Sequence, residues 1–530
     1  MYTTLHHILF LINVIMDKIH LFERLAQNDK TLRRLRISSN VENGESFFPR
    51  KNYDWMELGK HLGQNETITE LSISFPDTTR DESDTWLDCL SHGLKNNRSI
   101  KLLSFRNIRF ARGSSFFVKL GRFWSWNQFL YCIRFNFCAI DIRECTNLAR
   151  AITLSSSIQN IIIRNTRLQV DNLLAISPAL HGWLDSFRLC NCGIDDCHIK
   201  ALSDLWVMEN KTPSSVDLSG NRNITAASCG PLSQVIKSIN SLSLSNTSIG
   251  DNGIVALFQT YDELSYHDSP TTSNLRILNL EGSNLTDSAC RTLRLVLRRQ
   301  EYSITKLNLN SNNISDKGMK LLVKGLKGNT SLDSLHLDKN RITQKGWQLV
   351  LNLVCNVSTI DATKQSNHTL ATLTGPPNDF WKTNLGSSIN SMLSINKQAA
   401  RKVRRGHRMR VTGRNAIGRR IAAATKITNE HLVDLYKSSS TILNCDDDNL
   451  FPLIIAWIAN HHRWVLNWYD AKIAFTAMNH LVQHKCNLFQ TQHRYKGTRV
   501  ISKHLPLTYF DRWCIISTQE REKKRVKLVK

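Results

Sequence analysis

Four arginines recur at similar intervals along one part of the chain, with two aromatic residues beside the second of them. Guanidinium groups bind carboxylates and phosphates through paired N–H donors, and arginine beside aromatic side chains is typical of a protein interface. The residues are Arg106, Arg134, Arg164, Arg188, Tyr131 and Phe137. They predict a surface that receives an acidic or phosphate-bearing partner. The competing interpretation is an exposed polar surface whose arginines have no partner.

A second set of side chains has the spacing of a metal site. His480, His484 and Cys486 could place two imidazoles on one face of a helix. No acidic or cysteine cluster completes a ligand set, so a polar helix face is the favoured interpretation. The sequence also contains no glycine-rich phosphate loop and no metalloprotease, hydrolase or kinase signature. We therefore predict a protein that is not an enzyme and binds no metal or cofactor.

A repeated sequence pattern predicts the strands and helices that would position the arginines. The stretch from residue 304 (ITKLNLNSNNISDKGMKLLVKGLKGNTS) and the stretch from residue 332 (LDSLHLDKNRITQKGWQLVLNLVCNVST) match each other position by position. In each copy, positions one, four and six are apolar, position nine is Asn, and apolar residues with helical spacing follow. A fixed period of this size predicts a solenoid of strand–helix repeats.

The same register extends outwards from these two copies. The spacing between successive copies varies, but the apolar type is held at positions four and six. Position one is occupied by Leu32, Ile68, Ile100, Leu130, Ile158, Leu184, Pro213, Ile239, Leu275, Ile304, Leu332 and Val357. We therefore expect about 11 to 12 repeats, of which the N-terminal ones are less regular.

Position nine is a small residue in most copies. Its side chain should turn into the bend after each strand and satisfy backbone groups that would otherwise be buried without partners. The residues are Asn40, Cys138, Thr166, Cys192, Asn221, Thr247, Ser283, Asn312 and Asn340, whereas Pro76 and Ile108 break the pattern. Asn-x-Ser/Thr sequences such as those at Asn65 and Asn329 are interpreted as by-products of the repeat, not as glycosylation sites.

The arginines fall in the columns that should face away from the core. Side chains alternate along a strand, so positions five and seven project from the face opposite to positions four and six. Arg134 and Arg188 are in the fifth column, and Arg106 and Arg164 are in the seventh. Because neighbouring strands lie about 4.8 Å apart, the four arginines should form one cationic zigzag. The C-terminal copies present mainly Ser and Asn in these columns.

Helix-containing repeats of this length resemble the ribonuclease-inhibitor class of leucine-rich repeats. The resemblance covers roughly residues 17–370 and implies an α/β fold, namely a right-handed horseshoe solenoid with a parallel sheet inside and helices outside. It is specific for the fold and not for the target. Some proteins of this class activate the GTPase Ran through one catalytic arginine, which the sequence does not identify here. A helical segment after the repeats is similar to a C-terminal extension in leucine-rich-repeat proteins of diatoms and related algae.

Most of the positive charge lies after the repeats. The net charge is +25, and residues 371–530 hold 27 Lys and Arg against 10 Asp and Glu. Two basic segments stand out: Lys397, Arg401, Lys402, Arg404, Arg405, Arg408 and Arg410 in the first, and Lys523, Lys524, Arg525 and Lys527 in the second. Such segments serve as nuclear-import signals or nucleic-acid contacts, or are simply solvated.

These patterns predict five segments. Residues 1–31 form a capping helix. The apolar run 8–16 within them is too short to span a bilayer and lacks the flanks of a secretory signal, so these two alternatives are disfavoured. Residues 32–370 form the solenoid, and 371–426 form a basic, partly disordered linker. Residues 427–487 form a small basic α-helical extension, and 488–530 form a disordered basic tail. The 13 cysteines are expected to be reduced thiols of an intracellular protein.

The predicted function is that of a non-catalytic protein–protein interaction scaffold in the cytoplasm or nucleus. Its partner binds the concave face through an acidic or phosphorylated segment, and no membrane span is expected. The first alternative is a nuclear or nucleic-acid-associated adaptor that uses the basic C-terminal region. The second alternative is a GTPase-activating regulator of a small GTPase.

Overall fold

The computed structural model describes residues 19–38, 49, 52–75, 85–109, 115–155, 157–176, 184–258, 273–299, 302–356 and 366–404, with side chains to residue 398 in the last stretch. The chain divides into two compact units, residues 1–453 and 454–530, and all described residues belong to the first unit. The predicted helical extension and basic tail therefore lie outside the described residues, as do His480, His484 and Cys486.

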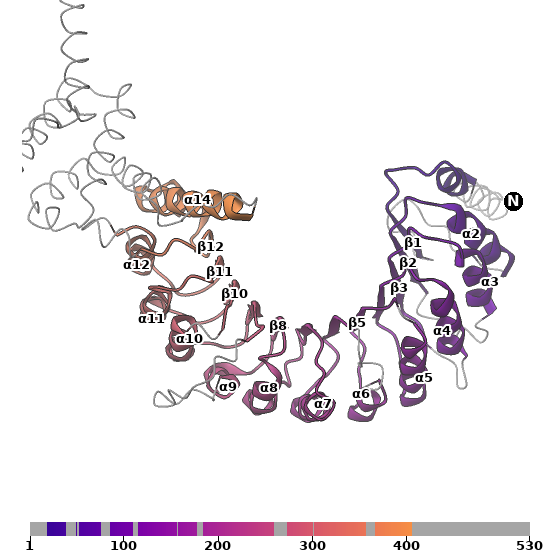
Figure 1. Ribbon diagram of the computed structural model, residues 1–530, viewed down its shortest axis with the longest axis horizontal. Helices are drawn as coiled ribbons and strands as arrows, with labels where there is room; N and C mark the ends of the chain where they lie inside the picture. The colour runs from indigo at the N-terminus through magenta and orange to yellow at the C-terminus, as the bar shows by residue number, and fades with distance from the viewer. Residues whose placement is uncertain are drawn as a thin grey trace, which may run out of the picture. The chain divides into compact units, whose positions relative to one another are not determined.

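The described strands form one parallel sheet in which each strand pairs with its neighbours in the sequence. The strands are β1 (Arg34–Ser38), β2 (Glu70–Ser74), β3 (Leu102–Arg106), β4 (Cys132–Asn136), β5 (Asn160–Arg164), β6 (Ser186–Cys190), β7 (Ser215–Asp217), β8 (Ser241–Ser243), β9 (Ile277–Asn279), β10 (Lys306–Asn308), β11 (Ser334–His336) and β12 (Thr372–Thr374). A helix follows almost every strand, so the strands line the inner face of an arc and the helices its outer face (Figure 1).

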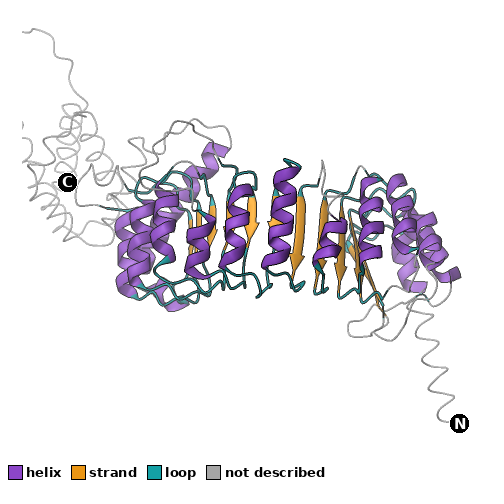
Figure 2. Cartoon of the chain, turned by 90° about the horizontal axis from the view of Figure 1, so that it is seen from below, coloured by secondary structure: helices purple, strands orange, loops and turns teal. Residues whose placement is uncertain are grey.

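Figure 2 shows the helices side by side along one face of the sheet. They are α2 (Asn52–Gln64), α3 (Thr85–Leu94), α4 (Phe116–Trp126), α5 (Ile142–Thr153), α6 (Val170–Ile176), α7 (Asp196–Met208), α8 (Cys229–Val235), α9 (Gly250–Leu257), α10 (Ala289–Arg298), α11 (Asp316–Leu326), α12 (Gln344–Val354) and α14 (Asn384–Arg404), with short 3-10 helices η2 (Ala226–Ser228) and η3 (Asn378–Lys382). The predicted α/β leucine-rich-repeat solenoid is confirmed.

The pairing register confirms the columns that define the repeat. Position four of each strand pairs with position four of the next, for example Leu71 with Leu103, Leu103 with Ile133, and Leu307 with Leu335. Positions four and six are buried in all these strands, and the helices add a second layer of buried apolar residues. One continuous hydrophobic core therefore runs between the sheet and the helices.

The twelfth repeat begins later than predicted. The assignment to Val357 is wrong, because β12 pairs Leu373 with Leu335 and this register places Leu370 at position one. Residues 371–404 are also not a linker, since they include β12, η3 and α14. Burial of Ile389, Met392 and Leu393 on α14 explains the order, because these apolar side chains pack on the end of the core. The additional residues between α12 and β12 lengthen this repeat, so its first position could not be located from the period of the other copies.

The ninth column satisfies backbone groups as predicted. Asn221 is 2% exposed, its Oδ1 accepts from the N–H groups of Cys192 and Ile194, and its Nδ2 donates to the carbonyls of Leu189 and Leu218. Cys192 replaces asparagine in the preceding repeat, and its thiol donates to the Ile163 carbonyl at 3.2 Å. A cysteine thiol supplies the donor, but its sulfur is only a weak acceptor for the N–H groups of a neighbouring turn.

A second series of asparagines closes the turns that lead from the helices back to the strands. Asn65 Nδ2 donates to the Leu25 carbonyl, and Asn97 Nδ2 donates to those of Leu62 and Asn65. The same arrangement recurs at Asn127, Asn329 and Asn367, and Asn396 within α14 makes the equivalent bond to the Leu370 carbonyl. Asn65 and Asn329 thus have the structural role assigned to them from the sequence, because their amides bridge adjacent repeats.

The N-terminal repeats are filled by large aromatic side chains. Residues 19–26 are helical, and Leu21, Phe22 and Leu25 are buried at this end of the core. Further along, Phe105 and Phe135 stack with ring centroids 5.8 Å apart, and Phe116 lies edge-on to Phe105 at 5.2 Å. These rings form one aromatic cluster in the core of the N-terminal repeats.

Glycines bring two helices of this region into backbone contact. A Cβ atom on Gly63 would lie 2.2 Å from the Gly93 carbonyl oxygen, and one on Gly93 would lie 2.1 Å from the carbonyl carbon of Gly59. No side chain larger than hydrogen fits between α2 and α3 at these points. The two helices therefore pack more closely than helices separated by side chains.

Candidate functional site

The candidate site lies on the concave face of the sheet, on strands β3 to β6. Their fourth and sixth residues are buried, whereas most residues at positions five and seven are only partly buried. The pairing places Arg134, Ile162 and Arg188 side by side in column five. Arg106, Asn136 and Arg164 are side by side in column seven. We call the four arginines, with Phe137, the cationic zigzag.

The register sets the spacing within the cationic zigzag. Arginines alternate between the two columns on consecutive strands, so each one is diagonal to the next. With strands about 4.8 Å apart and about 3.3 Å per residue, the Cα atoms of diagonal neighbours are about 8 Å apart. This separation lets neighbouring guanidinium groups meet the same extended anionic partner.

Few carboxylates neutralise these cations. Arg134 Nη1 lies 3.3 Å from Glu70 Oε1 on β2, and Arg34 lies on the other side of the same carboxylate. Arg188 Nε donates to the Ser186 hydroxyl at 3.1 Å. Among the described residues, no carboxylate lies within ion-pair distance of Arg106, Arg164 or Arg188. Three of the four guanidinium groups are therefore not paired with a carboxylate among the described residues.

Two of the arginines also have donors without partners. The Nε atoms of Arg134 and Arg164 are buried and make no hydrogen bond. Buried donors normally have partners, although the buried Nε of Arg294, outside the site, also makes no hydrogen bond within the described residues. Arg134 and Arg188 also act on one thiol between them: burial raises the pKa of Cys132, and both guanidinium groups oppose that rise.

Asp217 marks the end of the cationic region. It lies opposite Arg188 in the backbone register of β6 and β7 without forming an ion pair, and its Oδ1 accepts from the backbone N–H of Ser219 at 3.1 Å. The Cys190 thiol donates to Asp217 Oδ2 at 3.4 Å. Burial and this carboxylate raise the pKa of Cys190 to about 11, so the thiol stays protonated near neutrality. Beyond Asp217 the concave face is mainly Ser and Asn.

Phe137 has an uncommon backbone conformation for an aromatic residue. Its φ is +54°, and the equivalent position in neighbouring repeats is Asn107, Asn165, Asn191 or Gly220. Left-handed backbone costs a bulky L-residue about 1–2 kcal/mol, while Asn and Gly adopt it readily. The ring is 48% exposed and lies 5.2 Å from the Arg106 guanidinium. A strained and exposed aromatic residue is the kind of feature that marks a functional surface.

Phe137→Asn should stabilise the fold and weaken binding. Asn tolerates φ above zero, so we expect the free energy of unfolding to rise by about 0.5–1 kcal/mol after the loss of the cation–π contact. Binding to the captured partner should weaken about tenfold, as for an interface anchor. Urea denaturation and titration calorimetry measure the two effects.

Phe129→Asn is the matched control for this prediction. Phe129 is also 48% exposed and lies 5.8 Å from Arg98, but its φ is not positive and it lies outside the cationic zigzag. It should neither stabilise the fold nor affect binding. A Phe137→Asn protein with unchanged affinity would show that the strained residue has no role in recognition.

The structure separates one of the predicted residues from the rest. Tyr131 is 42% exposed but precedes β4, whereas Phe137 follows it. The two residues are about 20 Å apart along an extended strand, so Tyr131 does not flank the Arg106–Phe137 pair. The prediction also omitted position three, which carries the Glu70 partner of Arg134. The same alternation of side chains would have identified that column.

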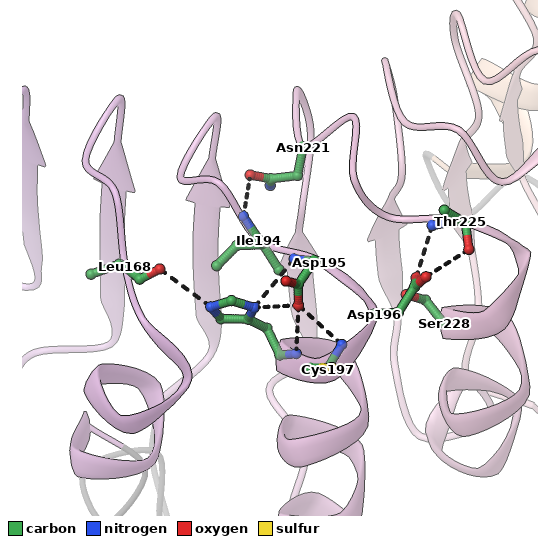
Figure 3. Close-up of polar contacts among 9 residues, drawn as sticks. Leu168, Ile194, Asp195, Asp196, Cys197, Asn221, Thr225 and Ser228 are labelled. Atoms are coloured by element: carbon green, nitrogen blue, oxygen red, sulfur yellow. Dashed lines mark hydrogen bonds and ion pairs between the residues drawn. The ribbon is translucent and has the colours of Figure 1, made fainter.

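A second polar cluster lies where β6 and β7 lead into their helices, and Figure 3 shows its contacts. Asp195 caps α7 by accepting from the N–H groups of Cys197 and His198, and its Oδ1 lies 2.6 Å from His198 Nδ1. Hydrogen bonding to His198 lowers the pKa of Asp195. His198 Nε2 donates to the Leu168 carbonyl at 3.2 Å. Both imidazole nitrogens are engaged within the fold, so this cluster ties repeats together and offers no free base.

Other candidate chemistry has little support in the described residues. All described cysteines are free, and burial raises the pKa of Cys192, Cys229 and Cys290 to about 12. No group of His, Cys, Asp and Glu side chains with a metal-site arrangement occurs in this part of the chain. Within the same residues, no helix has the length and apolar character needed to cross a bilayer.

The first basic segment starts on the last helix. Lys397 is exposed on α14, and residues 401, 402 and 404 belong to the same helix. The remaining cations of both basic segments, from Arg405 onwards, lie outside the described residues. The basic segments therefore stay predictions from the sequence.

Comparison with known proteins supports the repeat class. The family model for leucine-rich repeats matches residues 236–258 and 303–323. The chain is 30% identical over 228 residues to the human NACHT, LRR and PYD domains-containing protein 5, covering 37% of this chain and 18% of that protein. It is 23% identical over 228 residues to mouse ribonuclease inhibitor, covering 37% of this chain and 48% of the inhibitor.

Matches to solved structures have low sequence identity. The leucine-rich repeat-containing protein LegL7 from Legionella pneumophila is 14% identical with a TM-score of 0.38, and the match covers 68% of this chain and 97% of that structure. The chain spans less than half the length of the two curated relatives described above.

Proposed function

We propose that this ribonuclease-inhibitor-like leucine-rich-repeat protein is a non-catalytic scaffold whose concave face binds a protein partner. The observation that carries the proposal is the cationic zigzag, in which three arginines lack a carboxylate partner among the described residues and two have buried Nε donors without a hydrogen bond. We also propose that the protein acts in the cytoplasm or the nucleus.

The chemistry of the zigzag favours an anionic partner segment. Guanidinium groups bind carboxylates and phosphates in a two-pronged geometry that lysine cannot reproduce. Aspartate, glutamate or phosphorylated side chains spaced along an extended peptide could meet successive arginines about 8 Å apart. Phe137, beneath Arg106, would supply an apolar contact at one corner.

Affinity capture followed by mass spectrometry tests the proposal. The full chain, an Arg134→Glu/Arg188→Glu chain and a shortened chain that ends at residue 404 should be compared. The shortened chain keeps β12 and α14 and removes most of the Lys and Arg residues of the C-terminal region 371–530. A partner of the concave face should be captured by the full and the shortened chain and lost with the double variant.

The alternative, a nucleic-acid-associated adaptor, rests on the basic C-terminal region. Residues 371–530 contain 27 Lys and Arg against 10 Asp and Glu. Charge alone attracts nucleic acid without reading its sequence, and residues 397–420 lack the aromatic side chains that stack on single-stranded bases. This alternative predicts that nucleic-acid binding requires the basic segments and does not require the cationic zigzag.

Salt dependence should separate the two functions. A tail that contacts about six to ten phosphates of a single strand should lose about 300-fold to 10⁴-fold in affinity between 50 and 200 mM salt. A concave-face complex, whose apolar and partly buried contacts are screened less, should lose about tenfold or less over the same range. Fluorescence anisotropy with a labelled single-stranded RNA and with the captured protein partner provides both slopes. A steep slope for the protein partner would favour the tail.

A further inference from the structure

The last strand of the sheet faces an open groove. A cavity of about 510 Å³ lies between β12 and α14, within the range of about 300–1,000 Å³ typical of ligand sites. Its lining includes Thr372 and Thr374 on the strand and Asn390, Ser394 and Lys397 on the helix. Because residues 390, 394 and 397 are three or four apart, they form one stripe along α14.

The strand edge in this groove has unused hydrogen-bonding groups. In the preceding repeats, the carbonyl at position two accepts from the next strand, as Thr305 does from Asp333 and Ser334. The amide at position six donates to the next strand, as Leu337 does to Thr374. The equivalent groups of the last repeat are the Ala371 carbonyl and the Gly375 amide, and neither has a hydrogen bond within the described residues.

The two edges of the sheet differ in their side chains. β1 carries Arg34 and Arg36, and charges on an edge strand discourage pairing with another chain. β12 reads Thr-Leu-Thr, which favours strand pairing and has no charge. The C-terminal edge therefore retains the features of a template for a further strand.

We propose that this groove binds an extended segment of a partner protein by adding it to β12 as a further strand. In such complexes, backbone hydrogen bonds provide affinity and pockets for alternate side chains provide specificity. The Ala371 carbonyl and the Gly375 amide would supply the first backbone contacts. The site is separate from the cationic zigzag and does not depend on the function proposed for it.

The lining of the groove indicates the chemistry of the segment. Leu373 and Leu393 are buried beneath the groove and Trp381 is half-buried at its side, which suits an apolar side chain at the central position. Lys397 has no carboxylate partner among the described residues and suits an acidic side chain beside it. Asp338 accepts from the Thr374 hydroxyl and is thereby occupied. The expected segment is thus polar, apolar, polar, with an acidic residue near Lys397.

Selection from a phage-displayed library of random linear decapeptides tests the proposal. The full chain is the target. The library is first depleted on a Ser394→Trp chain, in which a tryptophan at this exposed position fills the groove, so that peptides binding elsewhere are discarded. Fluorescence anisotropy then measures the affinity of the selected peptides for the full chain, the Ser394→Trp chain and a Lys397→Glu chain. We expect acidic peptides that bind each variant at least tenfold more weakly.

Two matched variants serve as controls. Ser391→Trp introduces the same side chain on an exposed part of α14 that does not line the groove, and Lys382→Glu reverses an exposed lysine on η3. Both should bind the peptides like the unchanged chain. An empty selection would overturn the proposal, as would selected peptides whose affinity is unchanged by Lys397→Glu or is lost equally with Ser391→Trp.

Discussion

The Arg134→Glu/Arg188→Glu chain should bind its concave-face partner at least 100-fold more weakly than the unchanged protein. Arginines at the centre of an interface contribute about 2–4 kcal/mol each when truncated, and about 1.4 kcal/mol corresponds to a factor of ten. Reversal also adds repulsion of an anionic partner. Titration calorimetry with the partner identified by capture measures the loss.

The matched control reverses two arginines on the outer face. Arg143 and Arg150 are exposed on α5, so Arg143→Glu/Arg150→Glu gives the same change in net charge away from the sheet. This control should bind normally. Circular dichroism must show that both proteins are folded, because Arg134→Glu also removes the contact with Glu70. Equal binding by both double variants would remove the cationic zigzag from the mechanism.

Asn221→Leu should lower the free energy of unfolding by about 3–5 kcal/mol, because each buried polar group left without a partner costs about 1–3 kcal/mol. The substitution leaves the N–H groups of Cys192 and Ile194 and the carbonyls of Leu189 and Leu218 without the partners that Asn221 provides. Partial relaxation around these groups keeps the total below the simple sum. Urea denaturation followed by circular dichroism measures the change.

Asn221→Cys separates the donor from the acceptor role of this side chain. A thiol has one proton and can donate to one carbonyl at a time, as Cys192 does to the Ile163 carbonyl in the preceding repeat, and it is a weak acceptor for the two N–H groups. We expect a loss of about half that of Asn221→Leu. Equal losses for the two variants would indicate that packing, and not hydrogen bonding, determines the preference for Asn.

The sequence predicted the elements that obey a strict period. The columns led by Leu71, Leu307 and Leu335 recur because a buried strand position accepts few side chains, and the structure confirms their register. The four arginines could be placed on one face by alternation alone. The twelfth repeat was missed because Leu370 follows Leu332 at a longer interval than separates any of the other copies.

Other features of the site depend on relations that a sequence does not display. Glu70 on β2 contacts Arg134 on β4 across the intervening strand β3, and only the register shows that the two side chains meet. The strain at Phe137 is invisible until its φ is known, because the residue type alone does not reveal a left-handed backbone. The groove at β12 exists because α14 lies beside an edge strand, where the sequence predicted a linker.

The glycine contacts between α2 and α3 have a consequence for the geometry of the binding face. A solenoid of this kind bends because its helices are spaced more widely than its strands, which stay about 4.8 Å apart. Where Gly59, Gly63 and Gly93 let two helices approach to backbone contact, that difference is reduced and the local radius of curvature increases. We therefore expect the inner surface to be flatter across β1 and β2, on the N-terminal side of Arg106, than it would be with larger residues. A ligand that continues from the cationic zigzag towards the N-terminal end of the sheet would thus have to straighten beyond Arg106.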